Sequence, residues 1–169
     1  SANTISGDLG DDILSGGAAD DVLAGDGGND QLDGGTGNDT LGGGAGDDLI
    51  SASEGIDTID GGADVDTLDY SVLGSASAVN IALDGATQVT ATVTGSGNDL
   101  VSNVENVIGT AGADTLTGDS ADNTLTGGAG NDTLDGGDGS DTLDAGAGDD
   151  SLLASNGSDD IDGGTGTDV

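Results

Sequence analysis

Carboxylates recur every nine residues along this chain, each shortly after a group of glycines. One clear unit is Gly34–Gly42 (GGTGNDTLG), in which Asp39 is the sixth residue and Leu41 the eighth. Carboxylate oxygens beside flexible main-chain carbonyls suit Ca²⁺, which accepts about six to eight oxygen ligands, whereas Mg²⁺ requires a tighter octahedron. Zinc, copper and iron sites usually contain His or Cys, and the chain has neither. The residue types therefore predict calcium binding.

The sixth position of the unit is Asp in thirteen of its fourteen copies, and Asn123 is the exception. Stacked at the strand spacing of about 4.8 Å, or twice that on alternate edges, these residues would form acidic columns that require cations. The predicted side-chain ligands are Asp12, Asp21, Asp30, Asp39, Asp48, Asp57, Asp66, Asp114, Asn123, Asp132, Asp141, Asp150, Asp159 and Asp168.

A fixed short period with one aliphatic residue per unit predicts a stack of rungs, because a single rung cannot bury its own apolar side chain. The last three residues of each unit alternate, which predicts a very short strand with the eighth residue inward, and the first six predict a turn. The 36 glycines disfavour helix, so the fold class is all-β. Copies begin at Gly7, Gly16, Gly25, Gly34, Gly43, Ala52 and Gly61, and again at Gly109, Gly118, Gly127, Gly136, Ala145, Ala154 and Gly163.

The phase of the repeat divides the chain into four parts. Residues 1–6 are a leader into the stack, 7–69 a first block of seven nonapeptides, 70–108 an insert, and 109–169 a second block of six nonapeptides and a truncated seventh. In the insert, alternation around Ile81 and again from Val89, with the turn signal Asp84-Gly85 between them, predicts a hairpin on the side of the stack. Residues 100–108 predict a longer rung that restores the register.

The charge of the chain indicates which partners it can have. It contains 34 acidic residues and no Lys, Arg or His, for a net charge of −34, and its single aromatic residue is Tyr70. Such a composition predicts disorder unless a cation joins the folded state. Nucleic acid and anionic membranes require Lys and Arg for binding, so we expect neither as a partner. No apolar run is long enough to span a bilayer, and no Sec-type leader is expected within this chain. We also expect no enzyme activity, because the repeat accounts for every carboxylate pair and His, Cys and Lys are missing.

The unit resembles the RTX, or hemolysin-type, calcium-binding repeat; residues 127–135, for example, match it at every defined position. The resemblance implies a right-handed parallel β-roll, a β-helix or solenoid with two turns per coil, that binds calcium ions between units one coil apart, about ten in all. It also implies a module of a larger secreted or cell-surface bacterial protein, exported by type I secretion machinery and folding on extracellular calcium.

In this family the sixth position supplies carboxylate oxygen, and main-chain oxygens come from the first four positions of neighbouring turns. The irregular sites near Asn123, Asp57, Asp66 and Asp168 are the weakest matches. The carbonyl ligands implied by the resemblance are those of Gly7, Leu9, Gly10, Gly16, Gly17, Ala18, Gly25, Gly27, Gly28, Gly34, Gly35, Thr36, Gly37, Gly43, Gly44, Ala45, Gly46, Gly109, Ala111, Gly112, Gly118, Gly127, Gly128, Ala129, Gly130, Gly136, Gly137, Asp138, Gly139, Gly146, Ala147, Gly148, Gly157, Gly164 and Gly166.

The alternative function is ligand recognition by the outer face of the roll, in an adhesin or as a polysaccharide- or ice-binding module. Ice binding by a flat ladder requires the same outward residue on alternate units. The third position instead varies along one edge as Leu9, Gly27, Ala45 and Ala63. The sequence therefore favours the calcium-binding structural module.

Overall fold

The computed structural model describes residues 1–74, 77–153 and 155–169, and its regular elements in these ranges are all β-strands. Ala154, the predicted start of one copy, and residues 75–76 of the predicted insert lie outside the described residues. Sheet A, with ten strands, runs in the order β1 (Thr4–Ser6), β3 (Val22–Gly27), β5 (Thr40–Ala45), β7 (Thr58–Ala63), β11 (Gly97–Ser102), β10 (Val89–Val93), β9 (Val79–Ala82), β13 (Thr115–Thr117), β15 (Thr133–Asp135), β18 (Ser151–Leu153).

Sheet B has eight strands, and a further pair lies at one turn of the second block. Sheet B runs in the order β2 (Ile13–Ala18), β4 (Gln31–Thr36), β6 (Leu49–Ser51), β8 (Thr67–Asp69), β12 (Asn106–Ile108), β14 (Thr124–Ala129), β17 (Thr142–Ala147), β20 (Asp160–Asp162). The separate pair is β16 (Asp138–Gly139) and β19 (Asn156–Gly157). The part of the chain that the structure describes has no helix of the length and apolarity needed to cross a membrane.

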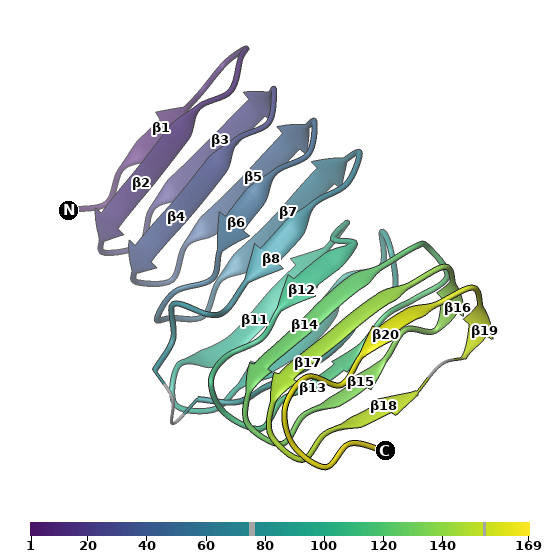
Figure 1. Ribbon diagram of the computed structural model, residues 1–169. Helices are drawn as coiled ribbons and strands as arrows, with labels where there is room; N and C mark the ends of the chain where they lie inside the picture. Colours follow the sequence, from purple (N-terminus) through teal and green to yellow (C-terminus); the bar gives the residue numbers. More distant parts are fainter. Residues whose placement is uncertain (75–76, 154) are drawn as a thin grey trace.

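Neighbouring strands within each block are parallel and two units apart in sequence. Leu14 pairs with Leu32 in sheet B, and Leu23 pairs with Leu41 in sheet A, so each coil contains two nonapeptides. Consecutive units therefore alternate between the two sheets, and the coils stack along the length of the molecule (Figure 1). The fold is a parallel β-roll, as the sequence predicts.

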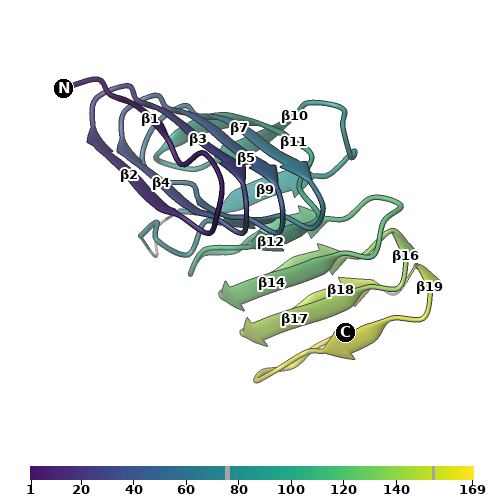
Figure 2. The same cartoon turned by 90° about the horizontal axis from the view of Figure 1, so that it is seen from above.

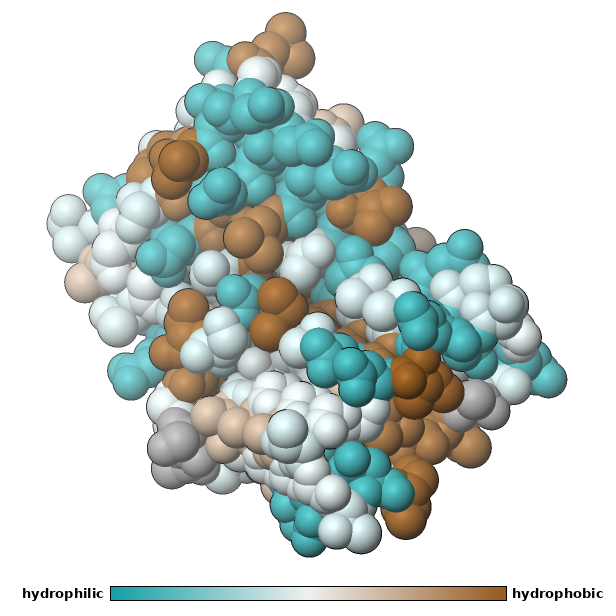
Figure 3. All heavy atoms as spheres, in the orientation of Figure 1, coloured by the Kyte–Doolittle hydropathy of each residue, from teal (hydrophilic) through white to brown (hydrophobic). Residues whose placement is uncertain are grey.

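The eighth residue of the unit forms the core between the two sheets, as predicted. Away from the ends of the stack its aliphatic side chain is at most 1% exposed, whereas Ile161 in the last strand of sheet B is 40% exposed. The face of the molecule seen in Figure 3 is mainly hydrophilic or neutral, with several apolar residues between. The buried eighth-position residues are Leu23, Leu32, Leu41, Ile50, Ile59, Leu68, Leu116, Leu125, Leu134 and Leu143.

Strands are longer, and turns shorter, than the sequence predicts. In β4 the strand continues from the seventh position of one unit through the third position of the next, and Gly35 and Ala18 both take part in the β2–β4 register. The prediction of a strand of three residues and a turn of six is wrong for such units, whose turn comprises only positions four to six. The same extension occurs in β3, which has Asp26 at the second position, and in β17, which has Ala145 at the first, so it does not require glycine at both positions.

Two positions of the unit take positive φ, which favours glycine. Gly35 in the second position has φ 91°, and Gly37 in the fourth has φ 141°. Asp26 and Ala19 stand in the equivalent positions of other units with φ 70° and 85°, conformations that carry strain in residues with a Cβ.

The hairpin predicted around Ile81 and Val89 forms as β9 and β10, but it lies within sheet A, so its predicted place on the side of the stack is wrong. β9 and β10 are antiparallel, as are β10 and β11, but β11 pairs in parallel with β7 and β9 in parallel with β13. In sheet B only β12 separates β8 from β14. The extra strands on one side make the sheets unequal in width, and the second block is turned relative to the first (Figure 2).

The last part of the predicted insert and the last part of the predicted leader belong to the roll. β11 and β12 form one coil that continues the first block, which agrees with the longer rung predicted for residues 100–108. Thr4–Ser6, within the predicted leader, already form β1 and pair with β3. The Asn3 main-chain N–H donates to the carboxylate of Asp21, as sixth-position residues do elsewhere.

Candidate metal centres

The sixth-position residues form two columns, each on the turns that lead into one sheet. Within a column, the main-chain N–H of one residue donates to Oδ1 of the residue one coil further on; Asp30 donates to Asp48 at 2.8 Å and Asp21 to Asp39 at 2.7 Å. Column A contains Asp21, Asp39, Asp57 and Asp99, and after an interruption Asp114, Asp132, Asp150 and Asp168. Column B contains Asp12, Asp30, Asp48, Asp66, Glu105, Asn123, Asp141 and Asp159.

The second oxygen of most of these carboxylates is buried without a hydrogen-bond partner among the described residues. A buried polar atom without a partner is costly, and a buried charge is more so. The chain has no cationic side chain to pair with any of them. A bound cation would supply the missing partner. The orphaned oxygens are Oδ2 of Asp12, Asp21, Asp30, Asp39, Asp48, Asp66, Asp132, Asp141 and Asp150.

Most of the orphaned oxygens share a small space with a main-chain carbonyl of the next coil, and glycine at the first position keeps that space open. A Cβ at Gly16 would lie 2.7 Å from Asp21 Oδ2 and 2.7 Å from the Gly34 carbonyl oxygen of the next coil. A Cβ at Gly7 would meet Asp12 Oδ2 at 2.7 Å and the Gly25 carbonyl at 2.9 Å. The donors are therefore hard oxygens from two adjacent coils, a set that fits Ca²⁺.

Main-chain oxygens dominate this donor set. Within the described ranges, no three acidic side chains lie close enough together to hold a metal ion by themselves. This arrangement agrees with a site in which each turn contributes one carboxylate and the neighbouring turns contribute main-chain carbonyls. The predicted carbonyls of Gly25, Gly34 and Gly43 face such spaces, whereas those of Gly127 and Gly136 face the side chains of Asp114 and Asn123, which have no orphaned oxygen.

Burial makes these carboxylates reluctant to ionise in the absence of a cation. Desolvation, with a smaller contribution from neighbouring carboxylates, raises the pKa of Asp66 to about 7 and that of Asp132 to about 6. The pKa of Asp57 also rises to about 7, again mainly through burial. Hydrogen bonds from the preceding coil oppose the rise without cancelling it. The folded chain therefore favours a counter-charge or a proton at these positions.

Some predicted ligands lie outside this pattern. Asp159 and Asp168 are half-buried at the end of the stack, although both accept the usual main-chain hydrogen bond at 3.1 Å. Oδ2 of Asp114 has protein donors, and Asn123 has an amide in place of a carboxylate.

Asp99 and Glu105, which are absent from the predicted ligands, continue the two columns into the insert. They accept hydrogen bonds from the Asp57 and Asp66 main chain at 2.8 and 2.9 Å. Gly97-Asn98-Asp99 followed by Val101 matches positions four to eight of the unit, a signal that identifies Asp99. Glu105 gives no such signal, because its turn lacks the first positions of the unit. The carbonyls of Gly61 and Ala145, also absent from the predicted set, face the spaces at Asp48 and Asp132.

A second ladder at the fifth position was also missed. Here the hydrogen bonds run the other way, since the main-chain N–H of the later coil donates to the side chain of the earlier one. Asn29 donates to Asp11 at 3.0 Å, and Asp47 donates to the Asn29 side chain at 3.1 Å. The signal was the recurrence of Asn-Asp and Asp-Asp pairs in the turns.

Stacked parallel coils with inward carboxylate columns define a β-roll built from repeats. The family model for the RTX calcium-binding nonapeptide repeat matches the chain in four copies, at residues 6–41, 42–71, 108–143 and 135–169. These matches cover most of the sequence, and the chain therefore belongs to the RTX calcium-binding nonapeptide repeat family.

Among solved structures, the chain is similar to the extracellular lipase LipA from Serratia marcescens, with 20% sequence identity and a TM-score of 0.31. The alignment covers 86% of this chain and 28% of the lipase chain. The comparison with curated protein sequences gives no significant match.

Proposed function

We propose that this chain is a calcium-binding structural module of a larger secreted protein and that it folds when extracellular calcium enters the spaces between its coils. The observation that supports this most strongly is the set of nine buried carboxylate oxygens without a partner, in a chain that has no cationic side chain. Folding without a cation would bury these charges uncompensated. When a cation binds during folding, the same carboxylates become its ligands.

The candidate ligands at each ion are a sixth-position carboxylate and main-chain carbonyls from the first four positions of adjacent turns. Calcium supplies positive charge there, and the chain supplies the spacing: the glycines leave room, and hydrogen bonds within each column hold Oδ1 so that Oδ2 faces the carbonyls. About ten ions remains our estimate from stacking. The nine orphaned oxygens are the positions that support it best.

Calcium concentration would then control folding. In a compartment with little calcium, a chain of net charge −34 repels itself and stays unfolded. At extracellular calcium near 10⁻³ M, sites with a Kd of about 10⁻⁴ to 10⁻³ M would fill and stabilise the roll by mass action. This behaviour suits export by type I secretion machinery as part of a longer chain, which the family resemblance implies. We infer no catalytic role, since the carboxylate columns already have a structural explanation.

Circular dichroism during a calcium titration tests the proposal, with Mg²⁺ at the same concentrations as the control. We expect β-structure to form cooperatively with calcium and not with magnesium, because Mg²⁺ retains its waters and demands octahedral geometry. A chain that is fully folded in excess chelator, or that ignores calcium, would refute the proposal.

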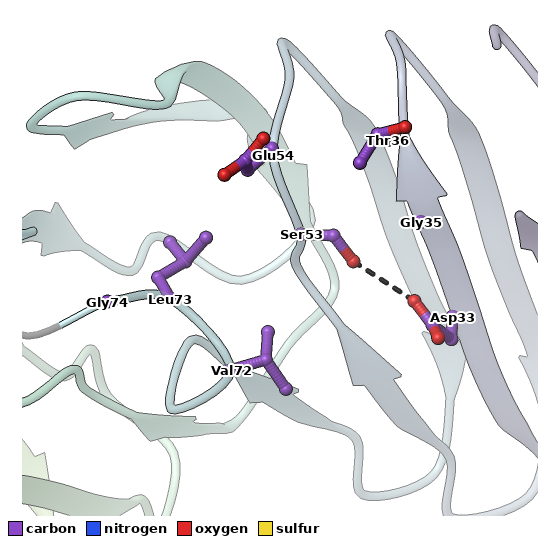
Figure 4. A pocket seen from close by; sticks show the side chains of 8 residues that line it. All are labelled: Asp33, Gly35, Thr36, Ser53, Glu54, Val72, Leu73 and Gly74. Carbon is purple, nitrogen blue, oxygen red and sulfur yellow. Dashed lines mark hydrogen bonds between the residues drawn. The ribbon is translucent and has the colours of Figure 1, made fainter. Parts of the chain in front are cut away.

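Ligand recognition is the second candidate function, favoured by a groove on the outer face of the first block. The groove has a volume of about 290 Å³ and combines acidic side chains with the exposed Val72 (Figure 4). Within it, the Ser53 hydroxyl donates to Asp33 at 3.0 Å. Its lining residues are Asp33, Gly35, Thr36, Ser53, Glu54, Val72, Leu73 and Gly74.

Binding of the calcium-loaded module to an array of soluble glycans tests this second candidate. We expect Glu54→Gln to weaken any binding at the groove, and Asp84→Asn, which removes the same charge from an exposed turn elsewhere, to leave it unchanged. Equal effects of the two substitutions, or no binding by the native module, would exclude a role for the groove in glycan recognition.

A further inference from the structure

At three positions where the columns meet the insert, both polar atoms of the side chain have protein hydrogen-bond partners, whereas most block carboxylates have one oxygen without a partner. The first is Asp99, the last member of column A before its interruption. Its Oδ1 accepts the usual main-chain hydrogen bond from Asp57 at 2.8 Å. Its Oδ2, which elsewhere has no partner, accepts a hydrogen bond from the Tyr70 hydroxyl at 3.1 Å. Tyr70 is fully buried, and it is the only aromatic residue of the sequence.

The second position is Asp114, where column A resumes. Its Oδ1 accepts a hydrogen bond from the Val79 main chain at 2.6 Å, in keeping with the column. Its Oδ2 accepts one from the Thr110 main-chain N–H, also at 2.6 Å. Thr110 is the second residue of its unit, where most units have glycine with positive φ, but Thr110 has no positive φ and its N–H faces the carboxylate.

The third position is Asn123 in column B, the single sixth-position residue that is not acidic. The preceding member, Glu105, uses its main-chain N–H to donate to the Asp66 carbonyl at 3.2 Å. Glu105 therefore presents its carbonyl to the next coil, and the Asn123 side-chain amide donates to that carbonyl at 2.7 Å. An Asp at position 123 would place a carboxylate oxygen against the Glu105 carbonyl oxygen. The exception in the repeat thus follows from the reversed main-chain polarity of the preceding turn.

We propose that Tyr70, Thr110 and Asn123, the junction donors, replace calcium at these three positions and make the insert a metal-free clamp between two calcium-filled blocks. This inference rests on the proposed function of the blocks. The donors satisfy the buried oxygens by hydrogen bonds, so no cation is required where the two columns cross the insert.

The packing of the insert supports a clamp that is stable in its own right. The repeat buries about one aliphatic residue in nine, whereas the described part of the insert buries ten apolar side chains within residues 70–108. Its strands pair with both blocks: β11 with β7, β9 with β13, and β12 with β8 and β14. The buried residues are Tyr70, Leu73, Val79, Ile81, Leu83, Ala91, Val93, Val101, Val104 and Val107.

A matched pair of substitutions in column A tests the metal-free junction. Asp39→Asn and Asp99→Asn each replace one carboxylate by an isosteric amide and each remove one negative charge. We expect native mass spectrometry or calcium titration calorimetry to show at least one ion fewer for Asp39→Asn and an unchanged number for Asp99→Asn. Loss of an ion from Asp99→Asn, as from Asp39→Asn, would overturn the proposal.

Hydrogen–deuterium exchange during stepwise calcium removal from the whole chain tests the order of unfolding. We expect amides of β3, β5 and β17 to lose protection at higher free calcium than those of β9, β10 and β11. Simultaneous loss, or earlier loss in the insert, would contradict the clamp while leaving calcium-dependent folding intact. Protection that is independent of calcium throughout the chain would instead refute the proposed function. The two failures are therefore distinguishable.

Discussion

The repeat blocks and the insert solve the same problem of a buried carboxylate in different ways. In the blocks, Asp30 or Asp39 satisfies one oxygen through the neighbouring coil and leaves the other without a protein partner. In the insert, Asp99 has a partner for both oxygens, one from the preceding coil and one from Tyr70. In both regions Oδ1 accepts the same main-chain hydrogen bond from the neighbouring coil. The two regions differ only in whether a nearby protein group, such as the Tyr70 hydroxyl, reaches Oδ2.

The two columns also differ in how they pass the insert. Column A is interrupted, because the antiparallel strand β10 lies between β11 and β9 in sheet A. Column B continues through Glu105 and Asn123, because sheet B keeps parallel pairing from β8 to β14. Both sheets are continuous, but sheet B keeps parallel pairing throughout while sheet A inserts two antiparallel pairings, so the blocks change direction without separating.

Core truncation should produce the largest effect and should separate the two regions. Leu41→Ala in the first block and Ile81→Ala in the insert each remove a buried aliphatic side chain, at a cost of about 2 to 5 kcal/mol. We expect Leu41→Ala to shift the calcium midpoint of folding upward, because binding is coupled to closure of that coil. Ile81→Ala should instead reduce exchange protection in the insert at low calcium. Calcium titrations of both variants check this, and an identical response would remove the distinction between the regions.

Removal of the Tyr70 hydroxyl should have the next largest effect. Tyr70→Phe leaves Asp99 Oδ2 buried without its donor, which should destabilise the calcium-bound protein by about 1 to 3 kcal/mol. Urea unfolding in saturating calcium measures the loss, and the calcium stoichiometry should not change. An unaltered urea midpoint would show that the hydrogen bond between Tyr70 and Asp99 makes no net contribution to the stability of the insert.

Acid should partly replace calcium in the blocks. In chelator, the folded-state pKa of Asp57 and of Asp66 is about 7, above the ordinary value near 4, so the folded state binds more protons than the unfolded one. Their contribution to stability is fully present below about pH 4 and is lost as the pH rises toward about 7.

Circular dichroism of the chelated chain should therefore show more β-structure at pH 5 than at pH 8. With limiting calcium the direction should reverse, because protons compete with the metal for the same oxygens. Opposite trends, or none in chelator, would contradict this account of the block carboxylates.

Relief of backbone strain should give the smallest effect. Ala19 occupies a fourth position with φ 85°, where most units have glycine. Ala19→Gly should stabilise the first block by about 0.5 to 1 kcal/mol, the difference between left-handed strain and the greater chain entropy of glycine. Thermal unfolding in saturating calcium measures it, with Ala18→Gly, a neighbouring position without positive φ, as the destabilised control.

Much of the architecture followed from the period alone. One aliphatic residue and one carboxylate per nine residues predicted the stack, the buried Leu41 and the acidic columns of Asp39 and its equivalents. Strand length was underestimated, because pairing through Gly35 depends on how closely neighbouring coils approach, and a single unit does not contain that information. The placement of the hairpin failed for a related reason: Val89 and Ile81 indicate strands, but not which sheet edge those strands join.

By itself, the sequence determined that the chain must form stacked coils and must take up cations, because its period is regular and its charge of −34 has no internal counterpart. Only the tertiary structure decided where cations are unnecessary. Tyr70 and Asp99 lie 29 residues apart and meet only after the insert enters sheet A. Glu105 and Asn123 lie 18 residues apart and meet only where β12 pairs with β14 in sheet B. A hydrogen bond requires its donor to point at its acceptor, and residue types alone do not determine that orientation. The orientation is set only when the coils pack together.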